Sequence, residues 1–205
     1  QRPAAMSILV LIVLYKLGDA FAGALSTTFL IRGAGFGADV VGQVNKILAV
    51  VATIVGALVG GSIMTKLGLY RALMLFGILQ AISNLAYAVV ALFPQNIAIM
   101  AAAVGFENIC GGLGTAAFVA LLMALSNQRF TATQFALLSA LSSVGRVFLA
   151  GPVTPLLVQQ FGWAQFFVIT MFIALPGLIL LWWRKRDIVA LEPEPESALE
   201  VIKPA

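Results

Sequence analysis

The sequence contains no histidine and a single cysteine, and charged residues make up only 10% of its 205 residues. Without histidine, zinc sites and histidine-based catalytic triads are disfavoured, so we expect neither a metal site nor an enzyme. The single Cys110 excludes a disulfide framework within the chain. Soluble domains carry about 25% charged residues, so the low charge, together with 61% hydrophobic residues, indicates a membrane protein.

Apolar segments long enough to cross a bilayer recur six times, since a spanning helix needs about 20 mostly apolar residues. The segments are 7–31, 40–64, 72–93, 96–125, 133–158 and 163–183. The connections are short and contain the breakers Gly33, Pro94 and Gly162, which predicts antiparallel neighbours. The sequence therefore predicts an all-α polytopic bundle of six transmembrane helices over residues 1–186. Residues 187–205 form a polar, acidic tail that we expect to be disordered.

Basic residues are concentrated on one side of the alternating segments, which explains the net charge of +4 without a nucleic-acid partner. The residues on that side are Arg2, Lys66, Arg71, Arg129, Arg184, Lys185 and Arg186. The opposite side has Arg32 beside Asp39. By the positive-inside rule, both termini of this segment are predicted to be cytoplasmic. Because the chain begins at Gln1, we also expect it to be a fragment.

Five ionisable residues lie inside the apolar segments: Lys16, Asp19, Lys46, Glu107 and Arg146. A charge at the bilayer centre costs about 2.5 to 3.5 kcal/mol on insertion scales, so it normally faces a bundle interior or a wet cavity. Residues three, four and seven apart share a helix face. The polar faces are Lys16, Asp19, Gly23 and Ser26; Gln43, Lys46 and Thr53; Gln80, Ser83, Asn84 and Tyr87; Glu107, Gly111, Gly114 and Thr115; and Ser139, Ser142, Ser143 and Arg146. These stripes predict a polar cavity between the first, second, fourth and fifth helices, with the apolar sixth helix facing lipid.

Each charge has a structural alternative beside a functional one. Lys16 and Asp19 are three residues apart and can neutralise each other, and Lys46 can extend to the headgroups. Arg146 keeps its charge, so it is an anion-binding group or a permanent partner of Glu107 or Asp19. Glu107 is either half of such a pair or a group that carries a proton, with Asp19 as the rival proton carrier.

Two weaker patterns concern the architecture. A shift of 88 residues places Asp19 on Glu107, and Gly23, Leu25 and Thr27 on identical residues, which predicts two three-helix repeats. Gly56 and Gly60 form a small-xxx-small spacing that predicts a close helix crossing.

Longer motifs carry a family resemblance. The loop after the second helix has Gly61, Thr65, Lys66, Gly68 and Arg71. This pattern resembles a degenerate copy of the loop signature of the major facilitator superfamily. In that signature an acidic residue is usual at the position of Thr65. The runs that extend the resemblance are YKLGDAFA at 15–22, TTFLIRG at 27–33, ATIVGAL at 52–58, FGILQ at 76–80, FENICGGLGTAAFVALLM at 106–123 and ATQFALLSALSSVGRV at 132–147. They are similar to the C-terminal half of the muropeptide permeases within that superfamily.

The resemblance implies helices seven to twelve of a proton-coupled symporter in a bacterial inner membrane. Such a symporter imports anhydromuropeptides, GlcNAc-1,6-anhydroMurNAc with or without peptide, from periplasm to cytoplasm for peptidoglycan recycling and, in some species, β-lactamase induction. The implied energy source is the proton gradient, with no cofactor, and the implied partners are the substrate, membrane lipid and an N-terminal six-helix half. We expect this chain alone not to transport.

The candidate residues follow from the faces and the resemblance together. Asp19 and Glu107 are the proton-coupling candidates, and the substrate or cavity candidates are Lys16, Gln43, Lys46, Asn108, Gln134 and Arg146. Three alternatives stay open: a symporter for another polar sugar or peptide-like solute, a six-helix channel or assembly module, and an intramembrane enzyme. The last is disfavoured because no nucleophile and base occur together.

Overall fold

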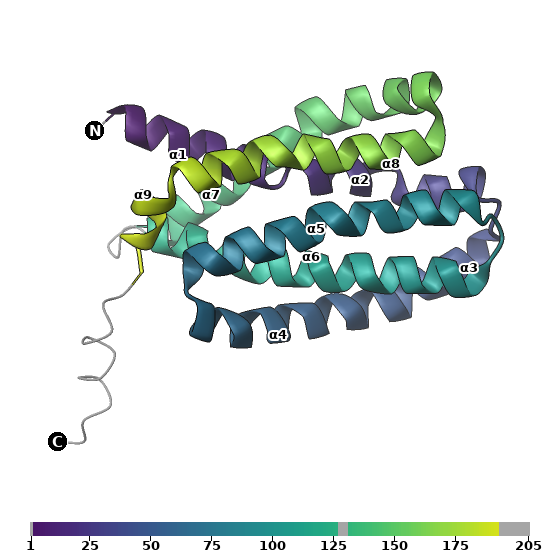
Figure 1. The fold of residues 1–205 in the computed structure, drawn as a ribbon, viewed down its shortest axis with the longest axis horizontal. Helices are drawn as coiled ribbons and strands as arrows, with labels where there is room; N and C mark the ends of the chain where they lie inside the picture. Colours follow the sequence, from purple (N-terminus) through teal and green to yellow (C-terminus); the bar gives the residue numbers. More distant parts are fainter. Residues whose placement is uncertain (1, 127–130, 193–205) are drawn as a thin grey trace.

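The computed structural model describes residues 2–126 and 131–192, and nearly all of them are helical (Figure 1). Several of the spans are interrupted by short π-helices, which are here labelled η. The elements are α1 (Arg2–Tyr15), α2 (Leu17–Thr28), η1 (Phe29–Gly33), α3 (Ala38–Gln43), η2 (Val44–Ala49), α4 (Val50–Leu67), α5 (Leu69–Leu92), α6 (Ile97–Leu125), α7 (Thr131–Val144), η3 (Gly145–Ala150), α8 (Gly151–Trp183) and α9 (Lys185–Val189).

The described residues cross the membrane six times, as predicted. Four apolar spans cover Met6–Gly33, Ala38–Leu67, Leu69–Leu92 and Ile97–Leu125, and a fifth stretch, Ala132–Trp183, has 52 residues. A straight helix of that length would measure about 78 Å, more than twice the roughly 30 Å of a hydrocarbon core. Gly162 breaks it with φ 76° and ψ 173°, a left-handed conformation suited to glycine, so α8 folds back as the sixth crossing.

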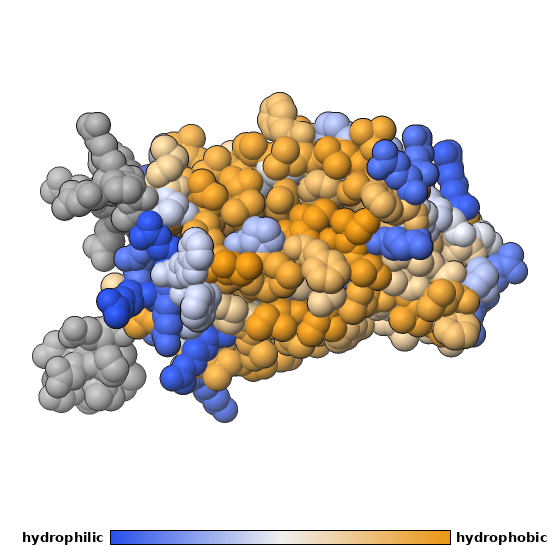
Figure 2. Space-filling model, turned by 45° about the horizontal axis from the view of Figure 1, so that its top comes forward, coloured by the Kyte–Doolittle hydropathy of each residue, from blue (hydrophilic) through white to orange (hydrophobic). Residues whose placement is uncertain are grey.

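The two ends of the bundle differ in charge. The start of α1, the α4–α5 connection and α9 lie at one end, and the α5–α6 connection lies at the other (Figure 1). An apolar band separates the two polar ends on the face in Figure 2, as expected for a bilayer-spanning protein. Five of the predicted cytoplasmic basic residues therefore share one end: Lys66, Arg71, Arg184, Lys185 and Arg186. Arg129 and the side chain of Arg2 lie outside the described residues.

Helices α4 and α6 touch through glycines, which confirms the crossing predicted from Gly56 and Gly60. A Cβ atom at Gly56 would collide with the backbone oxygen of Ile109, and one at Gly60 would lie 3.0 Å from Leu113 Cα. Across the contact, Gly112 faces the α4 backbone in the same way. Backbones this close gain dispersion contacts that take the place of the hydrophobic effect within a bilayer.

The bundle interior has an aromatic cluster near the α5–α6 connection. Phe29, Phe167 and Tyr87 pack with ring centroids 4.9 to 6.3 Å apart, mostly edge to face, and Phe166 and Trp163 extend the group. Because these rings come from the first, third and sixth spans, the cluster fixes those spans against one another.

The predicted boundary of the disordered tail at residue 187 was wrong. Asp187–Val189 belong to α9, and Ile188 is fully buried against the bundle. Glu192 then accepts a hydrogen bond at 2.9 Å from the backbone N–H of Tyr70, near the N-terminus of α5. A carboxylate at a helix N-terminus satisfies a free N–H and the helix dipole together, which explains how Glu192 is held against α5. Residues 193–205 lie outside the described part of the chain.

Candidate functional site

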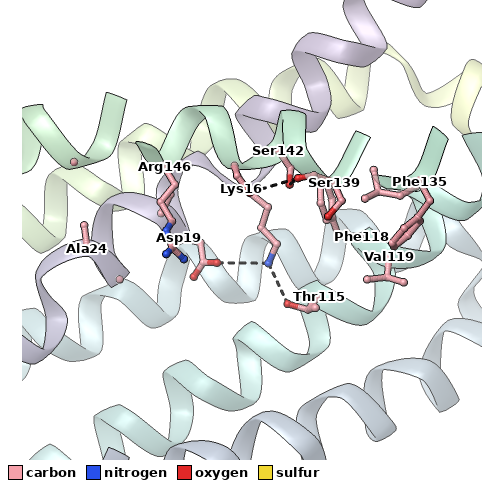
Figure 3. Close-up of a pocket in the computed structure, with 15 residues that line it drawn as sticks. Lys16, Asp19, Ala24, Thr115, Phe118, Val119, Phe135, Ser139, Ser142 and Arg146 are labelled. Carbon is pink, nitrogen blue, oxygen red and sulfur yellow. Dashed lines mark hydrogen bonds and ion pairs between the residues drawn. The ribbon is translucent and has the colours of Figure 1, made fainter. Parts of the chain in front are cut away.

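A cavity of about 650 Å³ opens within the membrane-spanning part of the bundle, between α2, α6, α7 and η3 (Figure 3). Its volume lies within the range of roughly 300 to 1,000 Å³ that is usual for small-molecule sites. Hydroxyl groups and charges line one part of it, and aromatic and aliphatic side chains line the rest. The main polar lining residues are Lys16, Asp19, Thr115, Ser139, Ser142, Ser143 and Arg146, and the main apolar ones are Phe118, Val119, Leu122 and Phe135.

Lys16 is held from several sides. It lies at the interruption between α1 and α2, with φ −93° and ψ 0°. Its Nζ lies 3.5 Å from Asp19 Oδ2 and donates to Thr115 Oγ1 at 3.2 Å, and the Phe118 ring centroid is 5.9 Å away. The side chains of Lys16 and Asp19 are 17% and 30% exposed. The predicted pair of Lys16 and Asp19 is therefore present, and it is also tied to α6.

Arg146 lies on η3, which packs against α2, and reaches into the same cavity beside Asp19 (Figure 3). Its guanidinium points toward Asp19, but among the described residues it forms no ion pair. An arginine that is always charged and has free N–H groups in a membrane cavity suits an anionic ligand. The permanent ion pair with Glu107 or Asp19 is therefore not formed among the described residues, and the role of Arg146 as an anion-binding group stays a prediction.

Glu107 lies outside the cavity lining, deeper between α5 and α6. Its Oε2 accepts a hydrogen bond from Asn108 Nδ2 at 2.9 Å and a longer one from Tyr87 Oη at 3.5 Å. Arg146 belongs instead to the cavity wall, so a fixed Glu107–Arg146 pair is absent from the described residues. Tyr87 is a partner that sequence reasoning missed, although its position in the α5 stripe was a usable signal.

Asn108 connects two helices rather than lining the cavity. Its Oδ1 accepts from Thr53 Oγ1 of α4 at 3.1 Å, and its Nδ2 donates to Val104 O at 2.8 Å. The hydrogen bond lies one turn from the glycine contact of α4 and α6, so it fixes the register of that crossing.

The second span does not line the cavity, contrary to the prediction from its polar stripe. Gln43 and Lys46 lie on α3 and η2, are exposed, and are absent from the lining. The exposure of Lys46 agrees with the alternative in which it extends toward the headgroups. Gln134, on α7, is half-buried and is also absent from the lining.

The polar stripe of α5 is internal. Gln80, Ser83, Asn84 and Tyr87 are 0 to 6% exposed and lie behind the cavity. The missed cavity residues Thr115, Ser139, Ser142 and Ser143 belong to the predicted polar faces of the fourth and fifth helices. The signal was therefore present, but the charged residues were singled out instead.

The loop motif after the second span lies at the basic end of the bundle. Gly68 ends α4 with φ 78°, a conformation that favours glycine, and Lys66 and Arg71 are exposed on either side of it. Gly61, one to two turns earlier on α4, has open space around it. With Lys185 and Glu192, the two basic residues line a second cavity of about 430 Å³.

Known proteins resemble the chain over most of its length. The sequence profile of the Major Facilitator Superfamily matches residues 4–204. The anhydromuropeptide permease of Escherichia coli strain K12 is 59% identical over 180 residues, which are 88% of this chain and 36% of that protein. An uncharacterized protein of Haemophilus influenzae is 38% identical over 186 residues, and the putative transporter AmpG 4 of Rickettsia felis is 32% identical over 191 residues.

The chain spans 36 to 45% of the length of these three relatives. The alignment with the Haemophilus protein includes 87% of this chain, and the alignment with the Rickettsia protein includes 92% of it. The family match extends over residues 4–204, which include all six apolar crossings. The cavity lies between the first, fourth and fifth of these crossings. The chain belongs to the Major Facilitator Superfamily.

Proposed function

We propose that this chain is the C-terminal half of a proton-coupled symporter that imports anhydromuropeptides across a bacterial inner membrane. The observation that carries the proposal is the cavity of about 650 Å³ in the membrane-spanning bundle, with Lys16, Asp19 and Arg146 in its wall. The relative that is 59% identical is named an anhydromuropeptide permease, which supports this substrate class.

The chemistry of the wall suits a substrate that is part sugar and part peptide. The hydroxyls of Thr115, Ser139 and Ser142 can donate to and accept from sugar hydroxyls. Arg146 matches a carboxylate, such as those of a peptide, through paired N–H donors. Phe118 and Phe135 provide apolar surface for the carbon faces of a sugar ring.

A second, N-terminal half would complete the cavity. Arg146, Ser143 and Gly151 are exposed in this half although they lie at membrane depth. Charged groups within a membrane normally face a bundle interior or a water-filled cavity, so we expect a second six-helix bundle opposite them. The share of 36% that the chain covers in its permease relative agrees with a missing partner half.

For proton coupling, Asp19 and Glu107 are the proposed carriers. Asp19 lies in the wall beside two cations, where substrate binding changes its surroundings directly. Glu107 lies deeper, with hydrogen bonds to Tyr87 and Asn108. The basic end of the bundle is proposed to face the cytoplasm, with transport directed toward it.

The test is uptake of radiolabelled anhydromuropeptide by the transporter that combines this chain with its N-terminal half. Asp19→Asn and Glu107→Gln should lose proton-driven uptake but keep counterflow exchange, which needs no net proton movement. Arg146→Ala should weaken substrate binding. Asp39→Asn, at the other end of the bundle, is the control and should match the unmodified protein. Equal uptake by all variants would exclude these residues, and ion conductance without substrate would favour a channel.

A further inference from the structure

A small internal cavity lies directly behind Asp19, on the side away from the substrate cavity. It is enclosed by the first, third and sixth spans, through Tyr15, Asp19, Gly77, Gln80, Asn84 and Ala174. Its volume is about 10 Å³, which is near the minimum of roughly 10 to 15 Å³ that one water molecule needs. Asp19 belongs to the walls of both cavities, so the small cavity is next to the proposed site but distinct from it.

Two buried amides in this wall lack partners. Gln80 is 6% exposed and Asn84 is 1% exposed. Gln80 Nε2 and both terminal atoms of Asn84, Nδ2 and Oδ1, form no hydrogen bond with the described residues. Buried polar side chains are nearly always paired with protein or ordered water, so these atoms indicate a bound polar ligand.

The surrounding chain leaves little room for other partners. Tyr15 Oη already donates to Leu73 O at 2.9 Å, and Ser83 Oγ donates to Gln80 O at 2.8 Å within α5. On the far side, the Gln80 amide lies against α6: a Cβ at Gly114 would collide with Gln80 Oε1, and one at Gly111 would make an ordinary contact with Gln80 Nε2 at 3.5 Å. The close approach of Gly18 to Ala174 closes the cavity between the first and sixth spans.

We propose that Gln80 and Asn84 hold one water molecule against Asp19, and that this water hydrogen-bonds the carboxyl group in both of its protonation states. The amide nitrogens donate to the water, and Asn84 Oδ1 accepts one of its hydrogens. The other hydrogen is donated to a carboxylate oxygen of Asp19 when that group is charged, and to its carbonyl oxygen when it is neutral. Gln80 and Asn84 are then positioning residues for the proposed proton carrier.

The water also lies toward the second proposed carrier. Tyr87 lies one turn beyond Asn84 on the same face of α5 and donates to Glu107. The other titratable or charged groups around Asp19 are Lys16 on its own span, Arg146 from η3 and Tyr15 from α1. The role in coupling rests on the proposed function, whereas the water site itself does not.

The water site is tested by a structure of the complete transporter at a resolution that shows ordered water. The expected result is one density peak within hydrogen-bonding distance of Asn84 and Gln80 in the unmodified protein, and its loss in Asn84→Leu. An empty cavity in the unmodified protein would overturn the proposal. So would a peak that depends on sodium, with the shorter ligand distances of a metal ion.

The role in coupling is tested by transport. Asn84→Leu and Gln80→Met keep side chains of similar shape and remove hydrogen bonding, and Ser83→Ala is a control in the same buried stripe. Each of the two variants should lower proton-driven uptake relative to counterflow by about tenfold, the usual effect of losing a hydrogen bond to a charged group, and displace its pH profile. Ser83→Ala should change neither quantity.

Three outcomes separate the hypotheses. Counterflow and uptake that fall together in both variants would show a merely structural role and overturn the coupling part of the proposal. An unmodified transporter that shows no proton-driven uptake would instead contradict the proposed function, and the density at Asn84 would then decide the water site alone. If neither variant folds, that same density in the unmodified protein decides it.

Discussion

Replacing Gly112 by alanine should destabilise the bundle, because the new methyl group would meet the backbone of α4. Its Cβ would collide with Thr53 O and lie 2.8 Å from Ala57 N and 3.0 Å from Gly56 C. Backbone atoms cannot turn aside as a flexible side chain does, so the two helices must separate. Overpacking of this kind costs about 1 to 3 kcal/mol.

Gly105→Ala on the same helix is the matched control. A Cβ there would lie 3.8 Å from the methyl groups of Leu48, an ordinary contact. Both substitutions gain the same helix propensity, about 1 kcal/mol, so this term cancels in the comparison. The difference between the variants should therefore be the overpacking cost alone, or roughly 2 to 12 °C in melting temperature for a chain of this size.

The assay is thermal unfolding of the purified protein in detergent, followed by tryptophan fluorescence. Gly112→Ala should melt below Gly105→Ala and below the unmodified protein. Equal melting temperatures for the two variants would refute the close backbone contact of α4 and α6.

Three further predictions concern the ends of the bundle and the cavity. Gly162→Ala should cost about 1 to 2 kcal/mol because of the positive φ, whereas Gly61→Ala, in open space, should not lower the melting temperature; equal effects would contradict the left-handed turn. Glu192→Ala should lower the melting temperature more than Asp187→Ala, because Glu192 holds the N-terminus of α5 while Asp187 forms a partly exposed, same-helix pair with Arg184 that is worth about 0 to 1 kcal/mol. The reverse order would refute this. Cys110 is buried, so the folded protein should react slowly with a maleimide, whereas Ser139→Cys should react readily and be protected by substrate; rapid labelling of the unmodified protein would contradict the packing of α6.

The sequence predicted features that depend on spacing within one helix or on a single special residue. The three-residue step from Lys16 to Asp19 placed the pair on one face, and the structure confirms the contact. Gly162 predicted the last reversal of the chain, and Gly56 with Gly60 predicted the close crossing. These features are local, so helical geometry is sufficient to derive them.

Features that depend on how helices face one another were not predictable in this way. A polar stripe shows which residues share a face, but not whether that face meets a cavity, the interior or the headgroups. Gln43 and Lys46 are therefore exposed, while Gln80 and Asn84 are buried, although all four belong to similar stripes. The hydrogen bond of Tyr87 with Glu107 depends on the packing of α5 against α6, which a single sequence does not specify.

The π-helix η3 has a consequence for the length of the fifth span. Gly151 N–H bonds to Arg146 O, five residues earlier, and both residues line the cavity. In a regular α-helix, five residues turn the chain about 140° past a full circle, so Arg146 and Gly151 would point in different directions. The wider turn thus acts as a one-residue insertion. It keeps the residues before η3 and the residues after η3 on the same face of the span. Deleting one residue between 147 and 150 should restore a regular helix whose two parts stay in phase, because four residues turn the chain only about 40° past a full circle, whereas inserting one residue there should rotate everything that follows, as far as the reversal at Gly162, by about 100° away from Ser139 and Arg146. The cavity wall is therefore encoded in the residue count of this span as well as in its polar side chains.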